Sequence, residues 1–167
     1  MSKEEYYLGI AEAVSIVSTC LKKHWGAVII KDNVIVSTGY NGAPRGVMEC
    51  TKRGYCHLTE CRNKNKGLSR GTMYEECYSV HAEQNAIIFG ELDRMKGSTL
   101  YLVGRERNSL EDNWEYVKNP VPCKLCRKMI LNAGIEKVVV RLDKDNYRII
   151  ETKSWKIQPE ENLVGGY

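Results

Sequence analysis

The sequence predicts an α/β protein in which helices pack in layers against a mixed β-sheet. The main observation is that β-rich runs alternate with segments whose apolar residues recur at helical spacing, after an opening hairpin. A length of 167 residues suits one domain with one hydrophobic core. We therefore expect a single domain over residues 1–167, with a cysteine-rich insertion at about 47–79.

The first element is expected to be an amphipathic helix over about residues 3–22. Ser2 and Glu5 have the spacing of a capping box, which satisfies backbone N–H groups at a helix start. The apolar residues that follow share one helical face: Ile10, Val14, Val17 and Leu21. Cys20 would then lie at the end of this helix.

A hairpin is expected next. Residues 25–30 and 34–38 are rich in strand-forming residues, and they flank the turn sequence Lys31-Asp32-Asn33. From residue 41 to residue 79 the pattern changes, because glycines, basic residues and cysteines are scattered there without a clear period. We expect little regular structure in that segment.

The carboxy-terminal half continues the alternation. Its expected elements are a helix at 80–90, a strand at 98–103, a polar excursion at 106–119, a helix at 122–133, and strands at 137–142 and 147–150. Pro122 and Gly134 delimit the second of these helices, since proline is favoured in the first turn of a helix and glycine just past its end.

Composition excludes several classes of protein. Hydrophobic residues make up 43% and charged residues 28% of the chain, as in ordinary globular proteins. A net charge of +4 would suit the binding of a phosphate-bearing small molecule. The basic residues are not concentrated in the stripe that is typical of a duplex-binding domain. No apolar run approaches the ~20 residues of a membrane span, and the polar start is not a signal peptide. We expect neither a nucleic acid nor a membrane as partner.

The cysteines point to metal binding and not to disulfides. Seven is an odd number, and two of the cysteines form a Cys-x-x-Cys pair. A secreted disulfide framework normally uses an even set, so reduced thiols in a cytoplasmic protein are the better interpretation.

The most informative motif joins His81-Ala82-Glu83 to Pro122-Cys123-Lys124-Leu125-Cys126. His81, Cys123 and Cys126 supply three ligands, whereas a structural zinc normally has four protein donors. Three donors leave a position for water, and Glu83 can then move the protons of that water. A zinc-ribbon half-site or a redox Cys-x-x-Cys would explain the cysteines, but neither explains Glu83 or Pro122.

The chemistry that this set predicts is hydrolytic deamination. Cys123 and Cys126 lie at i and i+3 in the first turn of a helix, where the positive end of the helix dipole favours thiolates. A zinc ion lowers the pKa of its bound water toward about 7, from about 15.7 in bulk. Attack of the hydroxide on an amidine-like carbon, with Glu83 as the proton shuttle, releases ammonia.

At these residues the chain resembles the cytidine deaminase superfamily, which shares the H-x-E and P-C-x-x-C signature. The resemblance implies a three-layer α/β/α fold with a five-stranded mixed sheet. The loop Gly39-Tyr40-Asn41-Gly42-Ala43-Pro44-Arg45-Gly46 and the run His81–Ile87 are similar to deoxycytidylate (dCMP) deaminases. The likeness covers about residues 18–140.

The dCMP deaminase resemblance implies conversion of dCMP to dUMP, which feeds thymidylate synthesis. It places Asn41 against the sugar or base of the nucleotide, and Arg45 is the candidate for its phosphate because the same loop should border the active site. It also implies a homo-oligomer, such as a hexamer. Many relatives are activated by dCTP and inhibited by dTTP, so Mg²⁺ with a dCTP effector is a further candidate, which the sequence leaves open.

A second, structural zinc is expected in the cysteine-rich insertion. A long segment without regular structure is uncommon unless something holds it together. Some dCMP deaminases similar to this chain have a structural zinc, with cysteines at positions matching Cys20 and Cys50. Cys77 is the third candidate, and the fourth ligand stays open among three residues: Cys56, His57 and Cys61. Alternatively these cysteines are small buried apolar side chains.

Three other functions are weighed against dCMP deamination. A tRNA adenosine deaminase shares the zinc motif, but it would need a basic groove with interleaved aromatic residues, and this chain has one Phe and diffuse charge. A nucleoside or guanine deaminase would not need a phosphate site. An inactive zinc scaffold would have no use for the proton shuttle Glu83.

Overall fold

The structure is a computed structural model that describes residues 1–65, 74–108 and 110–157. Its elements, in chain order, are α1 (Lys3–Ile16), β1 (Lys23–Lys31), β2 (Val34–Tyr40), α2 (Cys50–Arg53), α3 (His57–Lys64), η1 (Tyr74–Glu76), α4 (Ala82–Ile88), α5 (Leu92–Met95), β3 (Thr99–Asn108), β4 (Asn113–Tyr116), α6 (Lys124–Asn132), β5 (Lys137–Arg141), β6 (Tyr147–Glu151) and η2 (Thr152–Ile157). Within these residues no helix has the length and apolarity needed to cross a membrane.

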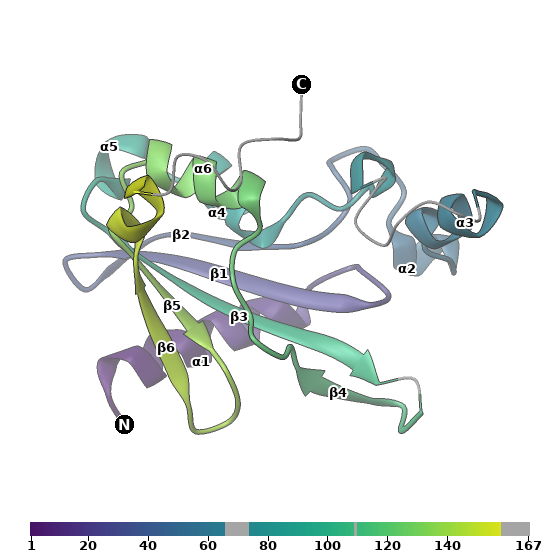
Figure 1. Ribbon diagram of the computed structural model, residues 1–167, viewed down its shortest axis with the longest axis horizontal. Coiled ribbons are helices and arrows are strands. Elements are labelled where there is room, and N and C mark those ends of the chain that lie inside the picture. Colours follow the sequence, from purple (N-terminus) through teal and green to yellow (C-terminus); the bar gives the residue numbers. More distant parts are fainter. Residues whose placement is uncertain (66–73, 109, 158–167) are drawn as a thin grey trace.

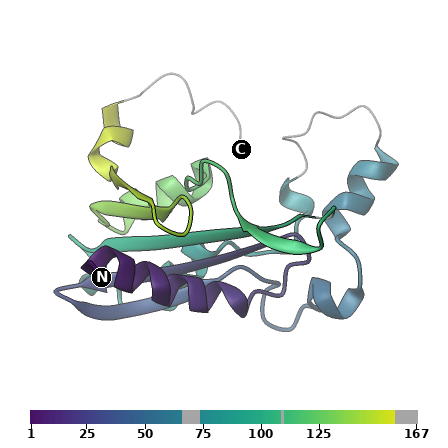
Figure 2. The same cartoon turned by 90° about the horizontal axis from the view of Figure 1, so that it is seen from below.

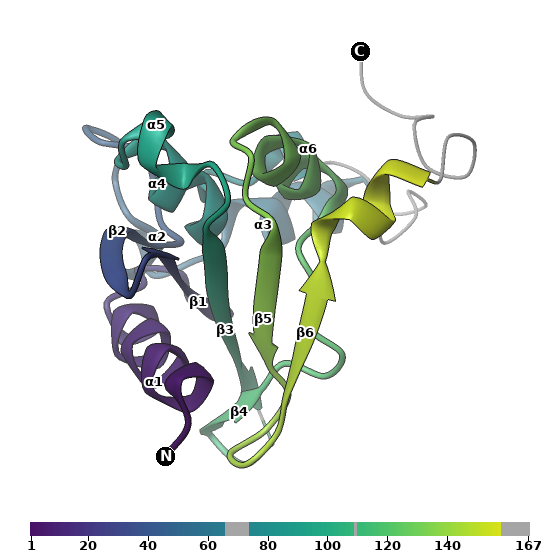
Figure 3. The same ribbon diagram turned by 90° about the vertical axis from the view of Figure 1, so that its left-hand side faces the viewer.

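The central sheet is mixed, as predicted. Its strand order is β2-β1-β3-β5-β6, and the short strand β4 also pairs with β3. Only β3 and β5 run parallel among the described pairs, and every other pair is antiparallel. Figure 3 shows β3, β5 and β6 side by side. The expected five strands are therefore present, with β4 added.

Helices cover both faces of the sheet, so the three-layer α/β/α prediction is confirmed. Helix α1 lies on one face, and α4, α5 and α6 lie on the other (Figures 1 and 2). A hydrophobic core lies on each face of the sheet. Alternate residues of β1 contribute to the two cores, because successive side chains of a strand point to opposite faces. Val28 packs with Leu8 of α1, whereas Ala27 packs with Ala82 of α4 and Ile130 of α6.

The first helix is shorter than predicted. It starts at the expected capping box, but it ends at Ile16, and the strand β1 begins at Lys23. Tertiary contacts explain the early end, because the Ser18 hydroxyl lies 2.7 Å from Oδ1 and 2.8 Å from the carbonyl oxygen of Asn41. This contact draws Ser18 toward the end of β2, and Cys20 lies in the connection and not on the helix.

Two other segments are more regular than predicted. The segment 41–79 contains α2, α3 and η1, and part of the expected insertion, residues 66–73, lies outside the described residues. Helices α2 and α3 lie beyond one end of the sheet (Figures 1 and 2). The polar excursion at 106–119 is a hairpin, because β3 continues to Asn108 and pairs with β4. Its polar side chains pair across the strands, as in the hydrogen bond from Asn108 to Glu115.

Gly39 of β2 determines how closely α4 can approach the sheet. A Cβ at this position would lie 2.3 Å from the Ala86 nitrogen and 2.4 Å from the Ala82 carbonyl oxygen, and both are backbone atoms that cannot turn away. We expect Gly39→Ala to lower the free energy of unfolding by about 1–3 kcal/mol through overpacking. Urea unfolding followed by circular dichroism measures this change.

Gly9 provides the matched control. It is exposed on α1, and no atom lies within 4 Å of the position of an added Cβ. Gly9→Ala should leave the stability unchanged or raise it by about 0.5–1 kcal/mol, since alanine is the better helix former. Equal effects of the two substitutions would contradict the role given to Gly39.

Candidate active site

His81 and Glu83 lie at the start of α4, and the end of β2 holds that helix in place. His81 is the N-cap residue, and its backbone N–H donates to Gln84 Oε1 at 2.9 Å. The Asn85 amide donates to the Tyr40 carbonyl at 2.7 Å, and the Ser37 hydroxyl donates to the Ala86 carbonyl at 2.6 Å. These bonds and the close approach at Gly39 position the first turn of α4.

The two motifs that the sequence singled out are joined directly. Gly42 and Val80 form an isolated antiparallel bridge, in which the Val80 N–H donates to the Gly42 carbonyl at 2.8 Å. The Gly39 to Gly46 loop is therefore tied to the residue just before His81. This contact supports the prediction that the loop borders the active site.

Cys123 and Cys126 lie at the start of α6. Cys123 is the N-cap residue, and its sulfur accepts a hydrogen bond from the Cys126 backbone N–H at 3.4 Å. Pro122 lies one residue before the N-cap, and not in the first turn of the helix as predicted. The helix therefore begins at Lys124, two residues later than predicted. Gly134 ends the helix as expected, in the left-handed conformation with φ 74°.

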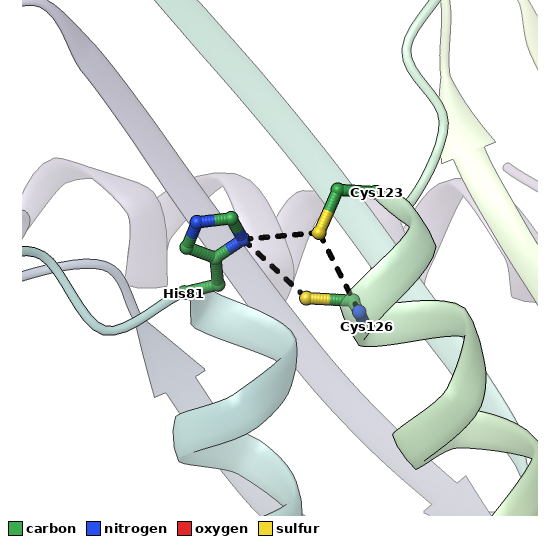
Figure 4. Close-up of side chains that lie close together, drawn as sticks. All are labelled: His81, Cys123 and Cys126. Carbon is green, nitrogen blue, oxygen red and sulfur yellow. Dashed lines mark hydrogen bonds between the residues drawn. The ribbon is translucent and has the colours of Figure 1, made fainter. Parts of the chain in front are cut away.

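The three predicted ligands converge. His81 Nδ1 lies 3.5 Å from Cys123 Sγ and 3.4 Å from Cys126 Sγ, so the side chains of two helix starts point toward one another (Figure 4). Tetrahedral zinc with bonds of about 2.0–2.3 Å requires nitrogen and sulfur ligands to lie about 3.5 Å apart. The donor types and their separations therefore fit a zinc ion with three protein ligands.

Electrostatics at the two thiols agrees with a metal site. The hydrogen bond between the two side chains lowers the pKa of Cys123 to about 4 and raises the pKa of Cys126. Hydrogen bonding to the Cys123 sulfur likewise raises the pKa of His81. Cys123 is thus a thiolate at neutral pH, which is the form that binds metal.

Glu83 is buried next to these ligands. It is 5% exposed, and burial raises the pKa of its carboxyl group. Among the described residues, no ion pair with Lys or Arg compensates its charge. A buried carboxyl group with a raised pKa holds a proton more readily than an exposed one and can pass it on, as a general acid–base catalyst must.

A cavity of about 440 Å³ opens onto this group of residues. His81, Glu83 and Cys123 line it, together with Asn41 and Trp25. Lys22 and Lys23, which the sequence analysis did not single out, also line the cavity. The hairpin register could have revealed them, because Gly26 pairs with Tyr40 and the residues before Gly26 must then lie beside Asn41.

Asn41 lies at the site, but its side chain is engaged with the backbone. Its Oδ1 accepts from the Trp25 N–H at 2.7 Å, and its Nδ2 donates to the Lys23 carbonyl at 2.9 Å. Arg45 does not line the cavity, and its guanidinium lies 4.6 Å from the ring centroid of Phe89, just past the far end of α4. Nucleotide binding by these two residues stays a prediction.

The cysteines expected at a second zinc are neighbours in the structure, and metal binding by them stays a prediction. Burial raises the pKa of Cys50, and the nearby thiols of Cys20, Cys56 and Cys77 raise it further. The sulfurs of Cys20, Cys50 and Cys77 nevertheless do not all lie within 4.8 Å of one another. Instead, the structure brings together His57, Cys61 and Glu76.

The fold and the site together define a class of enzyme. A mixed sheet with a His, two Cys and a buried Glu at two helix starts has the arrangement of the zinc-dependent deaminases of nucleobases. The profile of the cytidine and deoxycytidylate deaminase zinc-binding region matches residues 1–142. The chain belongs to this family of cytidine and deoxycytidylate deaminases.

Individual relatives point to the deoxycytidylate branch. The deoxycytidylate deaminase of Mycobacterium phage D29 is 35% identical over 139 residues, which cover 81% of this chain and 91% of the relative. That of Saccharomyces cerevisiae is 28% identical over 155 residues, covering 90% of this chain and 42% of the relative. The structure of the dCMP deaminase from cyanophage S-TIM5 in complex with dCMP and dUMP has a TM-score of 0.52 and 28% identity, and the match covers 86% of this chain and 85% of that one.

Proposed function

We propose that the protein hydrolyses dCMP to dUMP and ammonia. The observation that supports this proposal best is the cavity in which a buried Glu83 adjoins the convergent His81, Cys123 and Cys126. The substrate is proposed from the relatives, since the similar phage and yeast proteins are deoxycytidylate deaminases.

Each residue of the site has a chemical task. A zinc ion bound by His81, Cys123 and Cys126 would supply an activated water. The Glu83 carboxylate takes a proton from the attacking water and donates it to the ring nitrogen beside the reacting carbon. Glu83 then takes the second proton of the former water from the hydroxyl group on the reacting carbon and passes it to the amine, which leaves as ammonia while the carbonyl group forms. Burial suits Glu83 to these steps, because a raised pKa brings the carboxyl group closer to the pKa values of its proton partners.

The phosphate of the nucleotide is proposed to bind to basic residues that line the cavity. The basic residues Lys22, Lys23 and Arg62 line it together with Glu83 and the metal-binding residues, whereas Arg45 does not. Lys22 directly precedes strand β1, Lys23 is its first residue, and Arg62 comes from α3 of the insertion. We therefore propose that these residues hold the phosphate in preference to Arg45.

We expect dCMP to exceed deoxycytidine in kcat/KM by at least about 100-fold. A hydrogen bond to a charged group contributes about 1.5–3 kcal/mol, and each 1.4 kcal/mol changes the rate roughly tenfold. Release of ammonia from the two substrates at matched zinc content measures the ratio. Equal turnover would exclude dCMP as the preferred substrate and indicate a nucleoside deaminase with the same zinc chemistry.

Variants of the basic residues locate the phosphate. Lys23→Ala should lower kcat/KM for dCMP while changing that for deoxycytidine little, and Arg45→Ala should leave the ratio of the two substrates unchanged. The opposite result would return the phosphate to Arg45, as the sequence interpretation had it.

An anticodon stem of tRNA, assayed in parallel, tests the adenosine deaminase alternative. The homo-oligomer and the effect of Mg²⁺ with dCTP stay predictions from the family resemblance.

A further inference from the structure

A second cavity, the adjoining hollow, lies next to the active-site cavity and has a volume of about 760 Å³. The two cavities share Lys22, Lys23 and Cys56 in their linings. Because the two lysines are proposed to hold the phosphate, the adjoining hollow lies beside the phosphate end of a bound nucleotide. On the basis of the function proposed above, we propose that Glu106, which lines the adjoining hollow, makes the enzyme selective for nucleoside monophosphates over diphosphates.

The size of the adjoining hollow does not limit the number of phosphates. Pockets of about 300–1,000 Å³ enclose small molecules of drug size. A hollow of about 760 Å³ therefore has room for a further phosphate group. A preference for dCMP over dCDP at this end of the nucleotide must then come from the side chains that line the hollow.

These side chains carry as many negative as positive charges. The acidic residues of the lining are Glu60, Glu106 and Asp112, and the basic residues are Lys22, Lys23 and Arg107. Arg107 is already paired with Asp112, since its Nε donates to Oδ1 at 3.1 Å. Once the two lysines hold the first phosphate, the described part of the lining offers a second phosphate carboxylates and no further unpaired cation.

The register of the sheet places Glu106 beside the proposed phosphate site. Glu106 lies directly opposite Lys23 in the antiparallel pair of β1 and β3, and its Oε2 lies 3.1 Å from Lys23 Nζ. At the next residue, the Arg107 N–H donates to the Lys22 carbonyl at 3.0 Å. Opposite charges on directly opposed strand residues attract each other. The carboxylate therefore stays next to the ammonium group that would bind the phosphate.

This arrangement favours one phosphate and disfavours the next. A second phosphate that extends from Lys23 into the adjoining hollow comes close to the Glu106 carboxylate, and the two like charges repel. Repulsion of the wrong ligand contributes to specificity together with attraction of the right one. The side chains of Lys23 and Glu106 are 49% and 35% exposed, so solvent weakens the repulsion and a moderate effect is expected.

Glu106→Gln tests the role of this charge, with dCMP and dCDP as substrates and no added Mg²⁺. We use dCDP because dCTP is a candidate effector. Loss of one charge near the protein surface should raise the ratio of kcat/KM for dCDP to that for dCMP about five- to tenfold. Glu106→Lys should raise this ratio further. Where dCDP turnover is too slow to measure, competitive inhibition by dUDP relative to dUMP gives the same comparison. An unchanged ratio in both measurements would overturn the proposal.

Glu151→Gln is the matched control. Glu151 lies directly opposite Lys137 in the pair of β5 and β6, with a nitrogen to oxygen distance of 3.6 Å and side chains 44% and 49% exposed. It is not among the residues that line either cavity. The same change in net charge should therefore leave the ratio unchanged. A rise equal to that of Glu106→Gln would show that net charge, and not the position of Glu106, controls the ratio.

A double variant separates direct repulsion from an effect through Lys23. Glu106→Gln also releases Lys23 from its ion pair, which strengthens the hold on the first phosphate. In a Lys23→Ala background, Glu106→Gln should still raise the ratio of dCDP to dCMP, because repulsion by the carboxylate does not need the lysine. Loss of the effect in this background would make Glu106 a positioning residue for Lys23 and refute the repulsion.

Failure of this proposal is distinguishable from failure of the proposed function. Equal turnover of dCMP and deoxycytidine in the wild-type protein would refute the phosphate contact itself. A clear preference for dCMP over deoxycytidine, combined with an unchanged ratio of dCDP to dCMP in Glu106→Gln, would leave the proposed function intact and refute only the role of Glu106.

Discussion

Glu83→Gln is expected to lower kcat by at least about 10²–10⁴-fold, the range that a positioned general acid–base contributes. The amide keeps the size of the side chain but cannot accept and return a proton. Since Glu83 serves more than one proton transfer in the proposed reaction, the loss should lie at or above the upper end of this range. Steady-state ammonia release and zinc analysis of the same preparation measure both consequences.

The zinc content separates two roles for Glu83. Glu83→Gln should retain the active-site ion and still bind dCMP, because His81, Cys123 and Cys126 converge without it. Loss of the ion would make Glu83 a ligand and refute its assignment as the proton shuttle. Gln84→Ala, one residue further along α4, controls for disturbance of the helix start, since it removes the acceptor of the His81 N–H and leaves the carboxylate.

Cys123→Ser is expected to remove the active-site zinc and nearly all activity. A serine hydroxyl remains protonated near neutral pH, whereas the pKa of Cys123 is lowered to about 4 so that it offers a thiolate. Removing a residue that only orients a metal ligand typically costs about 10–100-fold in metal affinity, and loss of a ligand itself should exceed this. Zinc content and kcat measured on one sample check the two effects together.

Leu125→Ala is the control in the same helical turn. Leu125 lies between the two cysteines and is 58% exposed, so its truncation should change neither zinc content nor activity. If Cys123→Ser kept its zinc, the ion would not depend on this thiolate. The three-ligand site would then be wrong.

Local patterns were enough to predict most elements and the three metal-ligand side chains that converge in the structure. Asp32 and Asn33 adopt positive φ values of 50° and 63° in the turn between β1 and β2, a conformation that Asn and Asp tolerate better than most residues. Ser2 caps α1 through Glu5, as its spacing predicted. His81, Cys123 and Cys126 were identifiable from residue type and spacing, because metal chemistry restricts the donors so strongly.

The boundaries and partners set by distant residues could not be predicted in this way. Helix α1 ends at Ile16 and not near residue 22, because Ser18 contacts Asn41. The spacing of apolar residues along the helix gives no information about that contact. Arg45 was expected at the active site because its loop borders it, yet the side chain lies over Phe89. The position of a long side chain depends on which surface its loop reaches, and that surface belongs to another element.

The group formed by His57, Cys61 and Glu76 shows the same division between sequence and structure. His57 and Cys61 are four residues apart, and the sequence already made both of them candidate ligands. Glu76 joins them only because η1 packs against α3, so the cluster combines a local helical spacing with a tertiary contact. Spacing along the chain determines which residues share a helix face or strand, because backbone geometry repeats locally. Convergence of separate elements depends on the packing of the whole domain, and only the tertiary structure decided it.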